Sequence, residues 1–129
     1  MQSEQGRKYI MTNSIIKEKS RKFAINTIHL CKTVSDRNKE YIMTKQLLRS
    51  GTSIGANVAE GVRGQSKADF CAKMSIALKE ASETSYWLDI MHETGFLSHA
   101  EYKDANNDCE ELIRILVAIT KNTKGGDTK

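Results

Sequence analysis

The histidine, cysteine and acidic side chains are the residues through which this chain could bind a metal or perform catalysis. A carboxylate di-iron bundle needs Glu-x-x-His on two helices, and no glutamate here has a histidine three positions later. The nearest match is a single pair, Asp89 and His92. Cys31, Cys71 and Cys109 lack the C-x-x-C spacing of zinc sites. We therefore expect no metal and no cofactor, and cysteines that fill space in a core.

A glycine-containing segment, residues 61–67, shares residue types with phosphate-binding loops. Its sequence GVRGQSK lacks the spacing G-x-x-x-x-G-K-[ST]. It also contains G-x-x-G, which some RNA-binding folds use to clamp a backbone, but no sheet is predicted beside it. A plain turn between two helices is the better interpretation. No serine or cysteine has a recognisable base partner, so we expect no catalytic residues and no enzymatic activity.

Proline is absent from all 129 positions, which predicts an all-α protein with short connections. Apolar residues at helical spacing predict four helices, at about 15–37, 41–62, 66–94 and 98–123. Asn13 or Ser14 would cap the first, Ser66 the third, and the capping box from Ser98 to Glu101 the fourth. Helices of similar length with short loops pack as an antiparallel up-down four-helix bundle. We expect residues 1–12 and 124–129 to be flexible and 13–123 to form the bundle.

The location of the protein is indicated by three further features. No window approaches 18 uninterrupted apolar residues, so we expect no membrane span. Residues 1–7 are followed by no apolar segment of a secretory signal, and three cysteines do not make a disulfide framework. We expect a soluble, cytoplasmic protein with no membrane partner.

The second predicted helix contains three glycines, at 51, 55 and 61, each of which costs roughly 1 kcal/mol relative to alanine. Gly51 and Gly55 lie on or beside the core face, where another backbone could approach closely. The opposite face is small in the middle and charged at both ends. We expect this face to pack against something, and its two charged residues to find partners on another helix or subunit. Its residues are Arg49, Ser53, Ala56 and Glu60.

The third predicted helix carries Ile76, Trp87 and Ile90 away from its core stripe. A four-helix core alone would leave these side chains exposed, so they predict a subunit interface. A bundle with a wider core is the alternative that this pattern leaves open.

Charge is distributed unevenly along the chain. Residues 1–79 contain 15 basic and 6 acidic residues, whereas residues 80–129 contain 5 and 10. Basic residues on the outer sides of the first two helices could contact a phosphate backbone. A solvated helix face, or attraction between basic and acidic halves of neighbouring subunits, would explain the same pattern. The predicted phosphate contacts are Lys17, Arg21, Lys22, Lys32, Lys45, Arg49 and Arg63.

Residues 46–61, with the sequence QLLRSGTSIGANVAEG, resemble a known bacterial family, as do residues 16–24, 66–70 and 75–84. The family is that of the 23S rRNA intervening-sequence proteins, which are four-helix bundles sometimes labelled ribosomal protein. The resemblance covers about residues 14–120. The family includes the accessory variability determinant of diversity-generating retroelements, a basic homopentamer that binds nucleic acid and a reverse transcriptase. The resemblance therefore implies a ring-like pentamer and a nucleic-acid partner.

Taken together, residues and resemblance predict a non-enzymatic, oligomeric protein that binds nucleic acid, with rRNA or a ribonucleoprotein as the target. The alternative is a protein-interaction scaffold that holds a partner enzyme such as a reverse transcriptase.

Overall fold

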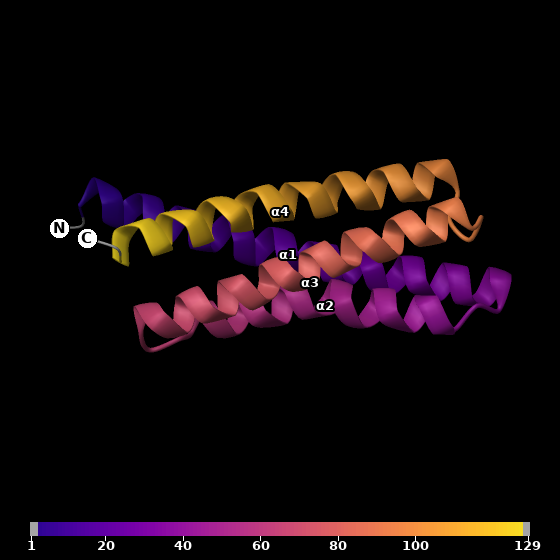
Figure 1. The fold of residues 1–129 in the computed structure, drawn as a ribbon, viewed down its shortest axis with the longest axis horizontal. Helices are drawn as coiled ribbons and strands as arrows, with labels where there is room; N and C mark the ends of the chain where they lie inside the picture. The colour runs from indigo at the N-terminus through magenta and orange to yellow at the C-terminus, as the bar shows by residue number, and fades with distance from the viewer. Residues whose placement is uncertain (1–2, 128–129) are drawn as a thin grey trace.

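The computed structural model describes residues 3–127, and this part of the chain forms four helices and no strand. They are α1 (Glu4–Asn38), α2 (Ile42–Val62), α3 (Lys67–Glu93) and α4 (His99–Asp127). Successive helices run in opposite directions and lie side by side, and α4 also contacts α1 (Figure 1). The start of α1 and the end of α4 lie at the same end of the bundle (Figure 1). The predicted all-α four-helix bundle is confirmed.

Local capping explains where α3 and α4 begin. The Ser66 hydroxyl accepts a hydrogen bond from the backbone N–H of Asp69, at 3.0 Å. Ser98 and Glu101 form the complete capping box: the Glu101 N–H donates to the Ser98 hydroxyl, and the Ser98 N–H donates to the Glu101 carboxylate. Gly95 lies two residues after the end of α3, and its φ of +84° is in the left-handed region that favours glycine. The predicted caps at Ser66 and at Ser98–Glu101 are confirmed.

The predicted start of the first helix was wrong. The helix begins at Glu4, and Ser3 caps it by accepting a hydrogen bond from the Gly6 N–H at 3.0 Å. Residues 4–14 contain no proline and lie within the helix, so neither Asn13 nor Ser14 is its cap. The fourth helix likewise ends at Asp127 rather than near 123. Residues 1–2 and 128–129 of the expected flexible ends lie outside the described residues.

The core contains apolar side chains from all four helices, in the stripes that helical periodicity predicts. Two buried polar residues, Ser50 and Thr84, join α2 to α3 through a hydroxyl–hydroxyl hydrogen bond of 3.0 Å. Each hydroxyl also donates to, or contacts, a carbonyl of its own helix, so neither polar group is buried without a partner. The largest apolar side chains that are fully buried are Ile16, Val34, Leu47, Ile54, Val58, Met74, Leu88, Met91, Leu112 and Leu116.

The glycines of α2 allow α1 to pack closely against it. A Cβ atom on Gly51 would lie 2.7 Å from the Thr27 Cγ2 atom. A Cβ atom on Gly55 would lie 3.1 Å from the backbone carbonyl oxygen of Ser20. The cost of these glycines is therefore offset by helix packing within one chain, and it does not argue for an oligomer.

Glu40 caps α2, a role that the spacing of residues in the sequence does not indicate. Its carboxylate accepts hydrogen bonds from the N–H groups of Ile42, Met43 and Thr44 and from the Thr44 hydroxyl, at 2.9–3.2 Å. Desolvation raises the pKa of Glu40, whereas these hydrogen bonds, led by those from Met43 and Thr44, lower it. The hydrogen bonds together have the larger effect, so the pKa of Glu40 is below its ordinary value.

We expect Glu40→Gln to lower the free energy of unfolding by about 1 kcal/mol at pH 7, as other N-cap substitutions do. Because the pKa of Glu40 is lower in the folded state, its contribution is complete above the unfolded pKa of about 4.3 and is lost as the pH falls through the folded value. The difference between variant and wild type should therefore shrink at pH 3. Urea unfolding at both pH values measures it, and a difference that grew in acid would contradict this role.

Candidate nucleic-acid interface

Four of the predicted phosphate contacts share the outer side of α1 and α2. At about 100° per residue, three of them follow one stripe of α1, and Lys45 lies across from the last of these on α2. All four side chains are exposed. Ile25 and Ile28 lie among them and are also exposed, at 39% and 49%. We call this surface the basic face; its residues are Lys17, Arg21, Lys32 and Lys45.

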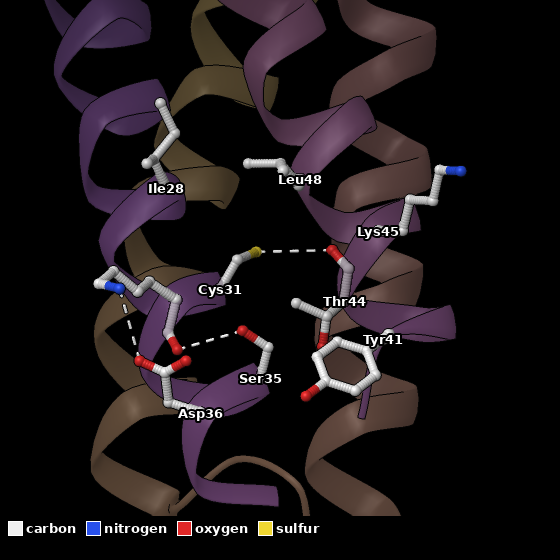
Figure 2. A pocket seen from close by; sticks show the side chains of 9 residues that line it. Ile28, Cys31, Ser35, Asp36, Tyr41, Thr44, Lys45 and Leu48 are labelled. Atoms are coloured by element: carbon white, nitrogen blue, oxygen red, sulfur yellow. Dashed lines mark hydrogen bonds and ion pairs between the residues drawn. The ribbon is translucent and has the colours of Figure 1, made fainter. Parts of the chain in front are cut away.

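A groove of about 390 Å³ opens on the basic face between α1 and α2. Its floor is formed by Cys31 and Thr44, and Ile28 and Leu48 lie at one end (Figure 2). The Tyr41 ring lies at the other end on the α2 side, and 60% of this residue is exposed. Its remaining lining residues are Lys32, Ser35, Asp36 and Lys45.

Cys31 is a structural thiol rather than a reactive one. Only 3% of the residue is exposed, and its Sγ atom donates to the Thr44 carbonyl oxygen at 3.6 Å. Burial raises the pKa of this thiol to about 12, so almost no thiolate exists at neutral pH. The thiol at the floor of the groove is therefore no nucleophile at neutral pH.

The charges around the groove remain accessible to a ligand. Lys32 pairs with Asp36 at 3.5 Å, but both side chains are more than two-thirds exposed, so this pair contributes little to stability. Lys45 forms no salt bridge with another described residue, and its side chain extends away from α1 (Figure 2). An incoming phosphate can therefore recruit either lysine at small cost.

Three predicted contacts lie elsewhere. Lys22 is exposed on the part of α1 that turns toward α4, about a quarter turn from Arg21. Arg49 forms ion pairs with two carboxylates of α3, so its charge is already compensated. Arg63 follows α2 and lines a separate cavity together with the acidic residues Glu60 and Asp69.

The predicted interface residues of α2 and α3 come together on one side of the bundle. Arg49 forms ion pairs with Glu80 and Glu83 of α3, and Glu60 pairs with Lys73 of the same helix at 3.2 Å. The prediction that both charged residues find partners on another helix is confirmed. These pairs set an antiparallel register in which Ala56 lies level with Ile76. We call this surface the α2–α3 face; its predicted residues are Arg49, Ser53, Ala56, Glu60, Ile76, Trp87 and Ile90.

The apolar part of the α2–α3 face is smaller than the sequence indicated. Ile76 is exposed, at 42%. Trp87 is only partly exposed, because it packs against the core and its indole N–H donates to Glu83 at 3.2 Å. Ile90 is half-buried. The expectation that a four-helix core would leave all three exposed was therefore wrong for Trp87 and Ile90, since the core is wider than a single stripe.

The acidic and histidine residues at the α3–α4 end join the two helices. Asp89 accepts a hydrogen bond from the Tyr102 hydroxyl at 2.5 Å, and the His92 ring stacks on the Tyr102 ring at 4.2 Å.

Among the described residues, no group of three or more His, Cys, Asp or Glu side chains could hold a metal ion. Within the same range, no helix combines the length and the apolar character that crossing a membrane requires.

The four antiparallel helices, capped at Ser66 and Ser98 and closely packed at Gly51 and Gly55, define a four-helix bundle with one basic outer face. Residues 12–118 match the family model of the 23S rRNA-intervening sequence protein, and the chain belongs to that family. A crystal structure of a protein of unknown function from the S23 ribosomal protein family of Bacteroides thetaiotaomicron is similar in fold, with a TM-score of 0.83. The two chains are 44% identical over 85% of this chain and 98% of the other. No curated protein matches the chain significantly.

Sequence reasoning did not identify Tyr41 and Leu48 as lining residues of a groove. Leu48 could have been found by the argument that identified Ile76, because it also lies off the core stripe of its helix. Tyr41 was expected to begin the second helix, but it stands in the connection before α2, so helical periodicity does not give the direction of its ring.

Proposed function

We propose that this protein is a non-enzymatic, oligomeric RNA-binding protein, and that rRNA or a ribonucleoprotein is its target. The observation that carries the proposal is the basic face, where four exposed basic residues line two adjacent helices. Such a surface binds a phosphate backbone electrostatically and releases condensed counterions. The family takes its name from an intervening sequence of 23S rRNA, which makes this rRNA the first target to test.

The shape of the bundle also suits backbone binding. The antiparallel helices α1 and α2, with their basic outer sides, form a long, shallow surface. Such a surface can contact several phosphates in a row without contacting the bases. Most of the acidic residues are in α3 and α4, away from this surface. The charge separation between the two halves orients the molecule toward a polyanion.

A titration of the protein against structured 23S rRNA fragments at several salt concentrations tests this proposal. We expect binding at low salt and a linear fall of log K with log salt concentration. An absence of binding at 50 mM salt would overturn the RNA-binding proposal and leave the scaffold for a partner protein.

We propose further that the α2–α3 face mediates self-association, and the family resemblance suggests five subunits. Ile76, level with Ala56 across the interhelical surface, would be the apolar centre of the contact. Completely burying such a side chain contributes about 1.5–3 kcal/mol, and less here because Ile76 is already partly covered.

We expect Ile76→Glu to dissociate the assembly to a species of about 14.5 kDa in light scattering. Val117→Glu is the matched control, because Val117 is exposed to nearly the same extent, 44% against 42%, but lies on α4. It should leave the mass unchanged. A wild-type mass near 14.5 kDa at micromolar concentration would refute self-association.

A further inference from the structure

The groove beside Tyr41 has features that contact with a phosphate backbone does not explain. Ile28, Leu48 and Tyr41 are all exposed, at 49%, 38% and 60%, and they surround one concave site. Phosphates contact charged and polar groups, so they would leave this apolar surface uncovered. The groove therefore fits a ligand that is flat and apolar on its faces and polar at its edge.

We propose that the groove binds one unpaired nucleotide of the RNA, with its base stacked on the Tyr41 ring. This inference rests on the proposed RNA-binding function and states which form of RNA the site selects. The bases of an A-form duplex are stacked on one another, and its deep major groove is closed to side chains. Only an unpaired base can present its face to an exposed aromatic ring.

The charges around the groove determine the orientation of the nucleotide. Asp36 on the α1 side is paired with Lys32 at 3.5 Å, so together they carry no net charge, whereas Lys45 on the α2 side forms no salt bridge with another described residue and would attract a phosphate (Figure 2). The phosphate is therefore assigned to Lys45 and the base edge to Asp36. A carboxylate accepts hydrogen bonds from an exocyclic amine, which cytosine has and uracil lacks.

The same charges favour a nucleotide over a side chain from a second protein molecule. The groove is bordered by Lys32 and Lys45, and lysine is depleted at the cores of protein–protein interfaces. It also lies in the half of the chain with 15 basic and 6 acidic residues. This complementarity commits the groove to a polyanion.

The test compares two fluorescently labelled RNAs of equal length, an unstructured single strand rich in cytosine and a blunt duplex. Each is titrated with full-length wild type, Tyr41→Ala and Tyr41→Phe. We expect Tyr41→Ala to weaken single-strand binding about 10-fold and to change duplex binding less than twofold. Tyr41→Phe keeps the ring and should bind like wild type.

Ile42→Ala is the matched control, because Ile42 is the next residue and is 80% exposed but does not line the groove. It should bind both RNAs like wild type. The Tyr41 side chain makes no capping hydrogen bond to α2, so its removal should leave the helix intact, as circular dichroism can verify.

The outcomes separate this inference from the proposed function. If wild type binds neither RNA, both fail. If wild type binds both RNAs and Tyr41→Ala weakens them equally or not at all, the inference alone fails. A change in oligomeric mass with Tyr41→Ala, without a selective loss of single-strand binding, would identify the groove as a protein interface and also overturn it.

Discussion

Replacing the four residues of the basic face with glutamine should lower RNA affinity about 100- to 1,000-fold at 0.1 M salt. Each lost contact with a single strand removes about 0.7 from the slope of log K against log salt concentration, so the slope should decrease by about 3. The magnitude is large because four contacts on one surface act on the same stretch of backbone. Filter binding at 50–300 mM salt measures both quantities.

The control for this variant replaces four exposed basic residues of α3 and α4 with glutamine. It changes the formal net charge by the same amount, from +4 to zero, so it corrects for long-range attraction. We expect its salt slope to stay close to that of wild type. Equal losses in the two variants would show that net charge, rather than the basic face, determines binding. The four control residues are Lys79, Lys103, Arg114 and Lys121.

Gly55→Leu should destabilise the bundle by about 3 kcal/mol. Even a Cβ atom at this position would lie 3.1 Å from the Ser20 carbonyl oxygen, and backbone atoms cannot rotate away as a side chain can. The remaining atoms of leucine would therefore push α1 away from α2. Urea unfolding, monitored by circular dichroism, gives the change in the free energy of unfolding.

Ala56→Leu is the control for this substitution, because Ala56 is the next residue of α2 but is exposed. Its effect on the free energy of unfolding should stay within about 0.5 kcal/mol. If the two variants were equally stable, the close approach of α1 and α2 at Gly55 would not be a feature of the molecule in solution.

The elements that sequence alone predicts well are those determined by neighbours along the chain. The caps at Ser66 and at Ser98–Glu101 depend on residues three positions apart, and the core stripes depend on a period of 3.6 residues. Both are local properties. They predicted the three connections between helices and most of the core correctly.

The start of α1 was missed for a local reason of a different kind. Residues 4–14 carry a weak apolar pattern, and Asn13 and Ser14 are good capping residues in their own right. A helix already started at Ser3 continues through them, because no residue there interrupts the backbone hydrogen bonds. Glu40 was missed because it caps α2 from two residues before the helix begins.

The burial of Trp87 could not be predicted from helical periodicity. A helical wheel gives the direction of a side chain but not the distance to the next helix. Here α2 and α3 approach closely enough for Trp87 to contact the core and for Arg49 to reach Glu80 and Glu83. Because Arg49 is paired with these two carboxylates, its charge is not free for a phosphate, although the distribution of charge along the sequence had placed it among the phosphate contacts.

Of the candidate site, the exposed basic residues could be predicted from the sequence, whereas the groove could not. Exposure of Lys17, Arg21, Lys32 and Lys45 follows from their positions opposite the core stripes. The groove between them depends on two helices meeting at a particular register, with Ile28 beside Leu48. That register is set by the glycine contacts of α2, and these contacts exist only in the folded structure.

Photo-crosslinking tests the central claim, that the basic face of α1 and α2 binds RNA, most directly. A 23S rRNA fragment containing 4-thiouridine would be bound to the wild-type protein, irradiated and digested, and the crosslinked peptides identified by mass spectrometry. We predict crosslinks within residues 17–48, on the basic face of α1 and α2. Crosslinks found only within residues 67–122, on α3 and α4, would contradict it.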